Sequence, residues 1–212
     1  MTTHYDDEEQ VENLKRWWKE NWAALAVGLG IGLAGILGWE QWKQYKIGKS
    51  EQASQIYEDM KKAVVAGKSE DAKASGDKLA KDFAMSPYAT DAALLLAGKA
   101  VEDGKLDDAL KQLQWVAANS KDEGLQRLAR LRQARVLWAQ NKPDDALKQL
   151  DGAAGEYENL YEELRGDIKL AQGDRAAARQ AYEKALKVQP EKAGANELLQ
   201  RKLDDLAVAV QS

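Results

Sequence analysis

The chain has 212 residues, of which 44% are hydrophobic and 31% charged, and its net charge is −4. The absence of cysteine excludes disulfides, thiolate zinc sites and a cysteine nucleophile, and one histidine, His4, cannot form a catalytic triad or a multi-histidine metal site. Lys and Arg alternate with Asp and Glu, so no basic stripe predicts a nucleic-acid partner, and no motif predicts a cofactor.

The first predicted element is a transmembrane helix at Trp22–Trp39. Its sequence, WAALAVGLGIGLAGILGW, contains no charged residue, and at about 1.5 Å per residue it spans roughly 27 Å, enough to cross a hydrocarbon core. Five of the seven tryptophans lie at or just beyond its ends, as interfacial aromatic belts do. Basic residues flank both ends, namely Lys15, Arg16 and Lys19 on one side and Lys43 and Lys46 on the other.

Two other interpretations of this segment are a buried core helix and a cleaved signal peptide. Core helices rarely carry aromatic and basic residues at both ends. The residues before the span are acidic, including Asp6, Asp7 and Glu8, and no small-residue cleavage site follows the apolar run. Instead, residues 40–48 continue the same helical pattern. The pattern therefore favours an uncleaved anchor.

One face of the predicted anchor carries small side chains, at Ala24, Gly28, Gly32 and Gly35. Small residues let a second helix approach closely, so this face is a candidate for packing against a membrane partner. Glycine is also frequent in membrane helices generally, and the sequence leaves both interpretations open. Orientation is open as well, because with Lys49 counted three Lys or Arg residues lie on each side, with a mild preference for the short tail inside.

Behind the anchor the chain contains internal repeats. The segments GKLDDALKQL, NKPDDALKQL and GDRAAARQAY begin at Gly104, Asn141 and Gly173, and their spacings of 37 and 32 residues lie near those of tetratricopeptide units, about 34. We expect Ala109, Ala146 and Ala178 to lie where the two helices of each hairpin cross. In the third repeat the motif's contact and turn positions are occupied by Leu164, Gly166, Gly173, Asp174, Ala178, Tyr182, Ala185 and Pro190.

The predicted fold class is all-α, a single N-terminal transmembrane helix followed by a tetratricopeptide-like α-solenoid. Paired aspartates such as Asp107 and Asp108 place negative charge at helix N-termini, and Pro143 suits a first turn. The last helix, at 193–208, is expected to cap the stack. The helices before it are predicted at 49–66, 70–83, 88–103, 106–118, 122–140, 144–153, 157–172 and 175–187.

Repeat stacks usually bind partners in a groove, and Leu131, Arg135 and Trp138 share one face of the helix at 122–140. They are candidates for lining such a groove. The alternative, which the pattern favours slightly, is that Leu131 and Trp138 are ordinary core between helices. The run Tyr161-Glu162-Glu163 is expected to be a solvated face.

Two blocks of residues resemble a known family. The N-terminal block includes Gln10-Val11-Glu12, Leu14-Lys15-Arg16-Trp17-Trp18 and Ala24-Leu25-Ala26-Val27-Gly28, followed by Gly38-Trp39. With Leu131-Arg132-Gln133-Ala134-Arg135-Val136 and Leu164-Arg165-Gly166-Asp167, it resembles the ancillary SecYEG translocon subunit family, the YfgM-like proteins. The N-terminal block is specific, whereas the repeat pattern alone occurs in many unrelated proteins.

The resemblance implies a single-pass protein of the bacterial inner membrane. It implies a cytoplasmic tail at 1–21, a transmembrane helix at 22–39, a juxtamembrane continuation at 40–48 and a periplasmic tetratricopeptide-like domain at 49–212. The implied partners are the lipid bilayer, the Sec translocon channel and a membrane-anchored periplasmic chaperone resembling a prolyl isomerase. The implied role is a non-catalytic accessory that links the channel to chaperones and helps newly translocated proteins fold.

Two other classes of function are a membrane-anchored scaffold and an enzyme. The alternative is a general membrane-anchored repeat scaffold or regulator in the bacterial envelope. An enzyme is disfavoured, because the chain has no cysteine, one histidine and no glycine-rich phosphate loop outside the apolar span.

Overall fold

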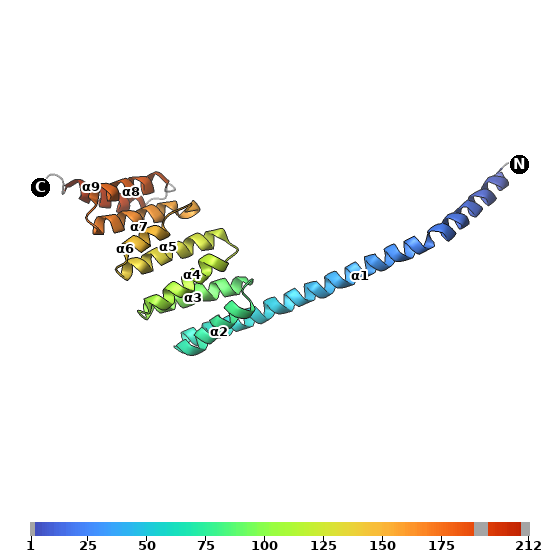
Figure 1. The fold of residues 1–212 in the computed structure, drawn as a ribbon, viewed down its shortest axis with the longest axis horizontal. Helices are drawn as coiled ribbons and strands as arrows, with labels where there is room; N and C mark the ends of the chain where they lie inside the picture. The colour runs from blue at the N-terminus through green and yellow to red at the C-terminus, as the bar shows by residue number, and fades with distance from the viewer. Residues whose placement is uncertain (1–2, 189–194, 209–212) are drawn as a thin grey trace. The chain divides into compact units, whose positions relative to one another are not determined.

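The computed structural model describes residues 3–188 and 195–208, and all regular structure in these ranges is helical (Figure 1). The chain divides into two compact units, Met1–Gln52 and Ala53–Ser212. The elements are α1 (Thr3–Val65), α2 (Ser69–Asp82), α3 (Pro87–Glu102), α4 (Leu106–Asn119), α5 (Glu123–Ala139), α6 (Pro143–Gln149), the 3₁₀ turn η1 (Gly155–Tyr157), α7 (Glu158–Ala171), α8 (Arg175–Val188) and α9 (Ala195–Val208).

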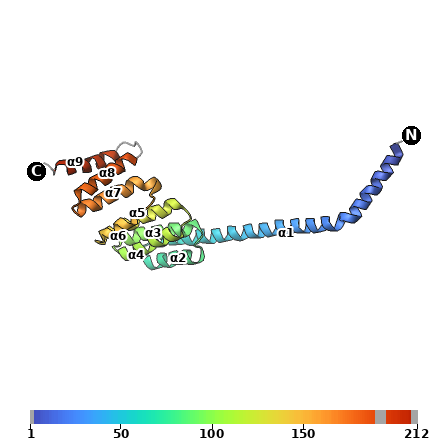
Figure 2. The same ribbon diagram turned by 45° about the horizontal axis from the view of Figure 1, so that its top comes forward.

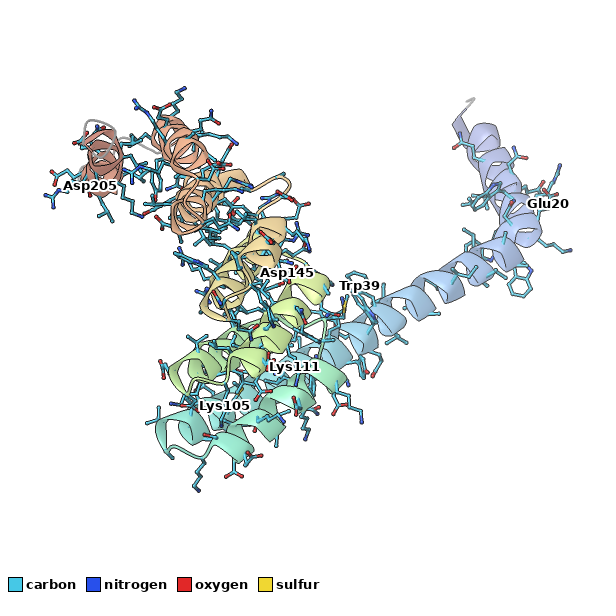
Figure 3. All side chains as sticks on the ribbon, turned by 60° about the vertical axis from the view of Figure 1, so that its left-hand side comes forward. Glu20, Trp39, Lys105, Lys111, Asp145 and Asp205 are labelled. Carbon is cyan, nitrogen blue, oxygen red and sulfur yellow. The ribbon has the colours of Figure 1, made fainter. Side chains whose placement is uncertain are left out.

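The first unit consists of the N-terminal part of α1, which continues without a break through the acidic tail, the apolar run and residues 40–52. The apolar side chains of this helix are largely exposed, for example Ile31 at 70% and Leu37 at 66%. Trp39 projects from the helix (Figure 3) and its ring lies 5.1 Å from that of Trp42, over which Nζ of Lys46 sits at 4.0 Å. By length and composition α1 is the one helix among the described residues that could cross a membrane.

The second unit begins with the end of α1 and is a stack of helical hairpins, in which each helix packs mainly on its neighbours in the chain (Figures 1 and 2). The hairpins α3–α4, α5–α6 and α7–α8 are the three predicted repeats. Ala109, Ala146 and Ala178 have no exposed surface, which confirms their predicted places at the helix crossings. Such nearest-neighbour packing defines an α-solenoid.

The first residue of each repeat segment lies in a hairpin turn that has a left-handed backbone. Gly104, Asn141 and Gly173 occupy equivalent repeat positions, and all three have left-handed backbones, with φ of 71°, 60° and 84°. Glycine and asparagine tolerate this conformation better than other residues. Within the third turn, Oδ1 of Asp174 accepts a 3.0 Å hydrogen bond from the backbone N–H of Ala177 and so caps α8.

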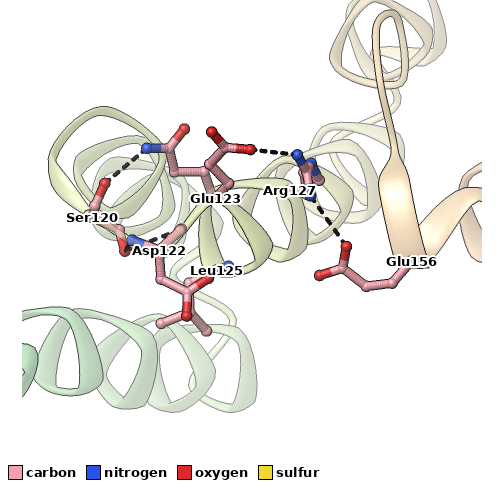
Figure 4. Close-up of polar contacts among 7 residues, drawn as sticks. Ser120, Asp122, Glu123, Leu125, Arg127 and Glu156 are labelled. Atoms are coloured by element: carbon pink, nitrogen blue, oxygen red, sulfur yellow. Dashed lines mark hydrogen bonds and ion pairs between the residues drawn. The ribbon is translucent and has the colours of Figure 1, made fainter.

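The loop after α6 departs from the prediction. The helix expected over 144–153 ends four residues early, and Gly155 then adopts a left-handed φ of 57°. A Cβ at Gly155 would approach Nη1 of Arg127 to 2.8 Å. That guanidinium is held by ion pairs to Glu123 at 2.6 Å and Glu156 at 3.1 Å (Figure 4). The loop therefore closes around a residue from α5, a contact that helix periodicity does not reveal.

The expectation that Tyr161-Glu162-Glu163 is a solvated face is wrong. Tyr161 is 2% exposed and its hydroxyl donates a 2.7 Å hydrogen bond to the backbone carbonyl of Arg127. Glu162 is 7% exposed and accepts a 2.9 Å hydrogen bond from Nζ of Lys184 in α8. The segment lies between packed helices because its charges find partners there, and paired carboxylates can be buried where single ones cannot.

The last described helix, α9, packs on α8 as the predicted cap of the stack. Leu199 and Leu206 of α9 are buried against Tyr182. Nζ of Lys202 reaches back to α7, with Oε1 of Glu163 at 2.8 Å and Oδ1 of Asp167 at 2.7 Å. The outer ends of the predicted capping segment, with Pro190, lie outside the described residues.

Candidate interaction surfaces

The small-residue face of the anchor is open. Ala24, Gly28, Gly32 and Gly35 are all exposed on α1, and a Cβ built at any of the three glycines meets no atom within 4 Å, apart from the backbone of the helix itself. Among the described residues of the first unit nothing covers this face, and a second helix could approach the α1 backbone closely. Its role in binding remains a prediction.

The three predicted groove residues separate in the structure. Leu131 has no exposed surface and packs with Leu164 and Ile168, so it is core, as the favoured interpretation expects, and does not line a groove. Trp138 is partly buried against the same cluster, as the core interpretation expects. Arg135 alone is exposed. The three side chains share a helix face only approximately, and α6 and α7 cover the part of it that carries Leu131 and Trp138.

Arg135 lies at a hollow on the face formed by α3 and α5, the first helices of two consecutive hairpins. The hollow has a volume of about 390 Å³, at the small end of the range for ligand sites, roughly 300–1,000 Å³. We call it the α3–α5 hollow. It is lined by Ala97, Gly98 and Val101 of α3, Leu106 and Leu113 of α4, and Arg132, Arg135, Val136 and Ala139 of α5.

The α3–α5 hollow combines an apolar floor with a basic rim. Leu113 and Val136 are 1% and 5% exposed and form the floor, while Val101 is 46% exposed at the edge. Its lining residues include two guanidinium groups and no carboxylate. Among the side chains that the structure describes, neither Arg132 nor Arg135 has an ion-pair or hydrogen-bond partner. This arrangement can bind an apolar group that carries negative charge beside it.

Several titratable side chains of the described residues are engaged in structural contacts. They include no group of three or more His, Asp or Glu side chains placed to hold a metal ion. The titratable groups with shifted pKa values have structural partners. Burial and a hydrogen bond to Asp167, for example, raise the pKa of the Tyr182 hydroxyl.

Comparison with known proteins identifies the family. The profile described as "Tetratricopeptide repeat-like domain" matches residues 15–208. The "Ancillary SecYEG translocon subunit" of Escherichia coli (strain K12) is 34% identical over 209 residues, covering 98% of this chain and 100% of that protein. The chain belongs to the ancillary SecYEG translocon subunit family.

Other members of the ancillary SecYEG translocon subunit family align over most of their length. The Haemophilus influenzae (strain ATCC 51907 / DSM 11121 / KW20 / Rd) protein is 31% identical, covering 87% of this chain and 91% of its own. The Neisseria gonorrhoeae (strain ATCC 700825 / FA 1090) protein is 30% identical, covering 97% of this chain and 100% of its own. The resemblance of the N-terminal and repeat blocks to this family is thereby confirmed.

A solved structure supports the fold alone. The crystal structure of MamA protein superposes with a TM-score of 0.54 at 16% sequence identity, covering 76% of this chain and 89% of that chain. Together with the family profile, this confirms the predicted tetratricopeptide-like α-solenoid.

Sequence reasoning missed most of the α3–α5 hollow. Gly98 and Val101 belong to α3, and the packing of both α3 and α5 on α4 brings them into one hollow with Arg132. One signal was available. Arg132 and Arg135 are three residues apart, a spacing that places both on one side of a helix.

Proposed function

We propose that this protein is a non-catalytic accessory subunit of the Sec translocon, anchored in the bacterial inner membrane by the apolar segment of α1. The observation that carries the proposal is the alignment with the E. coli ancillary SecYEG translocon subunit, which covers 98% of this chain and thus both the anchor and the repeat domain. In this proposal the tail at 1–21 is cytoplasmic and the domain at 49–212 is periplasmic.

The two units divide the partners between them. The small-residue face of the anchor contacts the Sec channel within the membrane, where close helix packing drives association. The repeat domain contacts a membrane-anchored periplasmic chaperone resembling a prolyl isomerase. The protein thus links the channel to the chaperone and helps newly translocated chains reach folding factors.

Co-purification from inner membranes in mild detergent tests this division. Gly28→Leu with Gly32→Leu should reduce recovery of the SecYEG channel and leave chaperone recovery largely intact, because the bulky side chains block close packing of the anchor. Gly30→Leu with Ala34→Leu is the matched control, since it adds nearly the same bulk, one methyl group less, with the same spacing, on the other side of the helix.

Three outcomes would count against the proposal. Failure of the unaltered protein to recover either partner would favour the alternative, a general membrane-anchored repeat scaffold or regulator. Equal recovery of both partners after exchange of the anchor for an unrelated span would contradict the division. Equal loss of the channel in the Gly28/Gly32 variant and its control would show that the small-residue face is not the contact.

A further inference from the structure

The α3–α5 hollow places two arginines, unpaired among the described side chains, beside an apolar floor. Several other long basic side chains of the domain reach carboxylates, as Arg127 does with Glu123 and Glu156, and as Lys202 does with Glu163. Arg132 and Arg135 have no such partner among the described side chains, although both lie on α5 within one turn of each other. The hollow therefore presents two guanidinium groups whose hydrogen-bond donors are available.

A guanidinium group has a specific ligand preference. Its planar fork of N–H donors matches a carboxylate, and the pair forms short, charge-assisted hydrogen bonds. The floor between the two arginines and α3 is aliphatic, built from Ala97, Leu113 and Val136. A simple anion would satisfy the arginines and leave this floor in water, so the floor specifies an aliphatic side chain beside the negative charge.

The hollow also favours a polypeptide over a small, enclosed ligand. Gly98, Val101, Arg132, Arg135 and Ala139 on its walls are all exposed, so the hollow opens along the face of α3 and α5. Gly98 lies inside α3, and a Cβ there meets no atom within 4 Å, which leaves the α3 backbone accessible. A chain can lie across such a face with one side chain inserted and its neighbours on the rim.

We propose that the α3–α5 hollow binds an acidic, aliphatic segment of a partner protein, with an aliphatic side chain on the floor and flanking carboxylates paired with Arg132 and Arg135. The proposal rests on the proposed function, in which the repeat domain receives a periplasmic protein partner. It specifies the chemistry of the segment that the domain recognises, and it places the contact on α3 and α5.

A substitution at Gly98 can be used to block the α3–α5 hollow. Gly98→Phe adds a large ring at the wall of the hollow, its Cβ would meet no atom within 4 Å, and it replaces glycine with a better helix former. Arg132→Gln with Arg135→Gln removes both charges and keeps side chains of similar length. Arg179→Gln with Arg201→Gln, on exposed faces of α8 and α9, removes the same charge far from the hollow in sequence and serves as the control.

The test is a selection from a random peptide display library on the full-length protein in detergent, followed by fluorescence anisotropy with the selected peptides. We expect the selected peptides to place Asp or Glu beside Leu, Ile or Val. Their Kd should rise at least about tenfold in the Arg132/Arg135 variant and in Gly98→Phe, and should change less than about twofold in the control. Replacing their Asp and Glu by Asn and Gln should weaken binding similarly.

Several results would overturn the proposal. These are a selection that enriches no peptide, selected peptides without carboxylates, or peptides that bind both hollow variants as tightly as the wild type. Circular dichroism melts show whether each variant is folded. If one of the two hollow variants is unfolded, the Kd of the other is used for the test. Recovery of the SecYEG channel by Gly98→Phe is measured in parallel, because an intact channel contact with lost peptide binding separates this inference from the proposed function.

Discussion

Adding one methyl group at Gly166 is expected to destabilise the repeat domain. Gly166 in α7 lies directly against the ring of Tyr182 in α8, and a Cβ built there would come within 3.0 Å of Cζ and nearer still to Cδ1. Tyr182 is fully buried, and its hydroxyl donates a 2.8 Å hydrogen bond to Oδ1 of Asp167. Moving the ring therefore disturbs both a packed core and that hydrogen bond.

Three contributions set the size of the effect of Gly166→Ala. Overpacking a core costs about 1–3 kcal/mol, and losing a hydrogen bond to a carboxylate costs about 1.5–3 kcal/mol. Replacing a helical glycine with alanine acts in the opposite direction and stabilises the helix by about 1 kcal/mol. With both costs at their lower ends, the free energy of unfolding falls by about 1.5 kcal/mol, which lowers the Tm of a domain this size by roughly 3–6 °C.

Gly98→Ala is the matched control, because Gly98 also lies inside a helix but has open space at its Cβ position. Only the propensity gain applies there, so the free energy of unfolding should rise by about 1 kcal/mol. The comparison is made by circular dichroism melts of both full-length variants in the same detergent. If Gly166→Ala melts at or above the wild-type temperature, the packing of Tyr182 against α7 is not as described.

Three further predictions follow from the same packing and from the proposed topology. Ala146→Trp should lower the free energy of unfolding by about 1–3 kcal/mol, because Ala146 is fully buried, and an unchanged melt would show that its helix crossing has room. Burial acts to lower the pKa of Lys202, but hydrogen bonds to Asp167 and Glu163 outweigh it and raise that pKa, and burial raises the pKa of Tyr182. The pKa values of Lys202 and Tyr182 thus lie above their usual values of 10.5 and 10.0. The two groups therefore stabilise the fold below about pH 10, and this stabilisation is lost as the pH rises above it. A Tm that stays constant to about pH 11 would contradict the α9 contacts. Protease added to spheroplasts should digest the repeat domain, and protection until lysis would reverse the proposed topology.

The local parts of the fold were predictable from sequence because local patterns determine them. The repeats place Gly104, Asn141 and Gly173 at turns, and the small residues between them mark the helix crossings. The helix boundaries follow from the same signals, and most predicted boundaries lie within one or two residues of the observed ones.

The missed features depend on contacts between helices that are distant in sequence. Glu162 looks like surface until Lys184 of α8 is placed beside it, and the loop at Gly155 packs against Arg127 of α5. The candidate groove was only partly predictable for the same reason. Arg135 is exposed as a groove residue should be, whereas Leu131 is covered by later helices, and Gly98 joins the site only because α3 and α5 both pack on α4.

Photo-crosslinking in living cells tests the proposed association with the translocon most directly. A photo-reactive amino acid is placed in turn at each position of the span at 22–39 and at exposed positions of the repeat domain, and the captured proteins are identified by mass spectrometry. We predict crosslinks to SecYEG subunits from positions 28, 32 and 35 and weaker ones from position 30. The absence of channel subunits from every position of the span, in cells where the full-length protein is present in the inner membrane, would contradict an accessory role at the translocon.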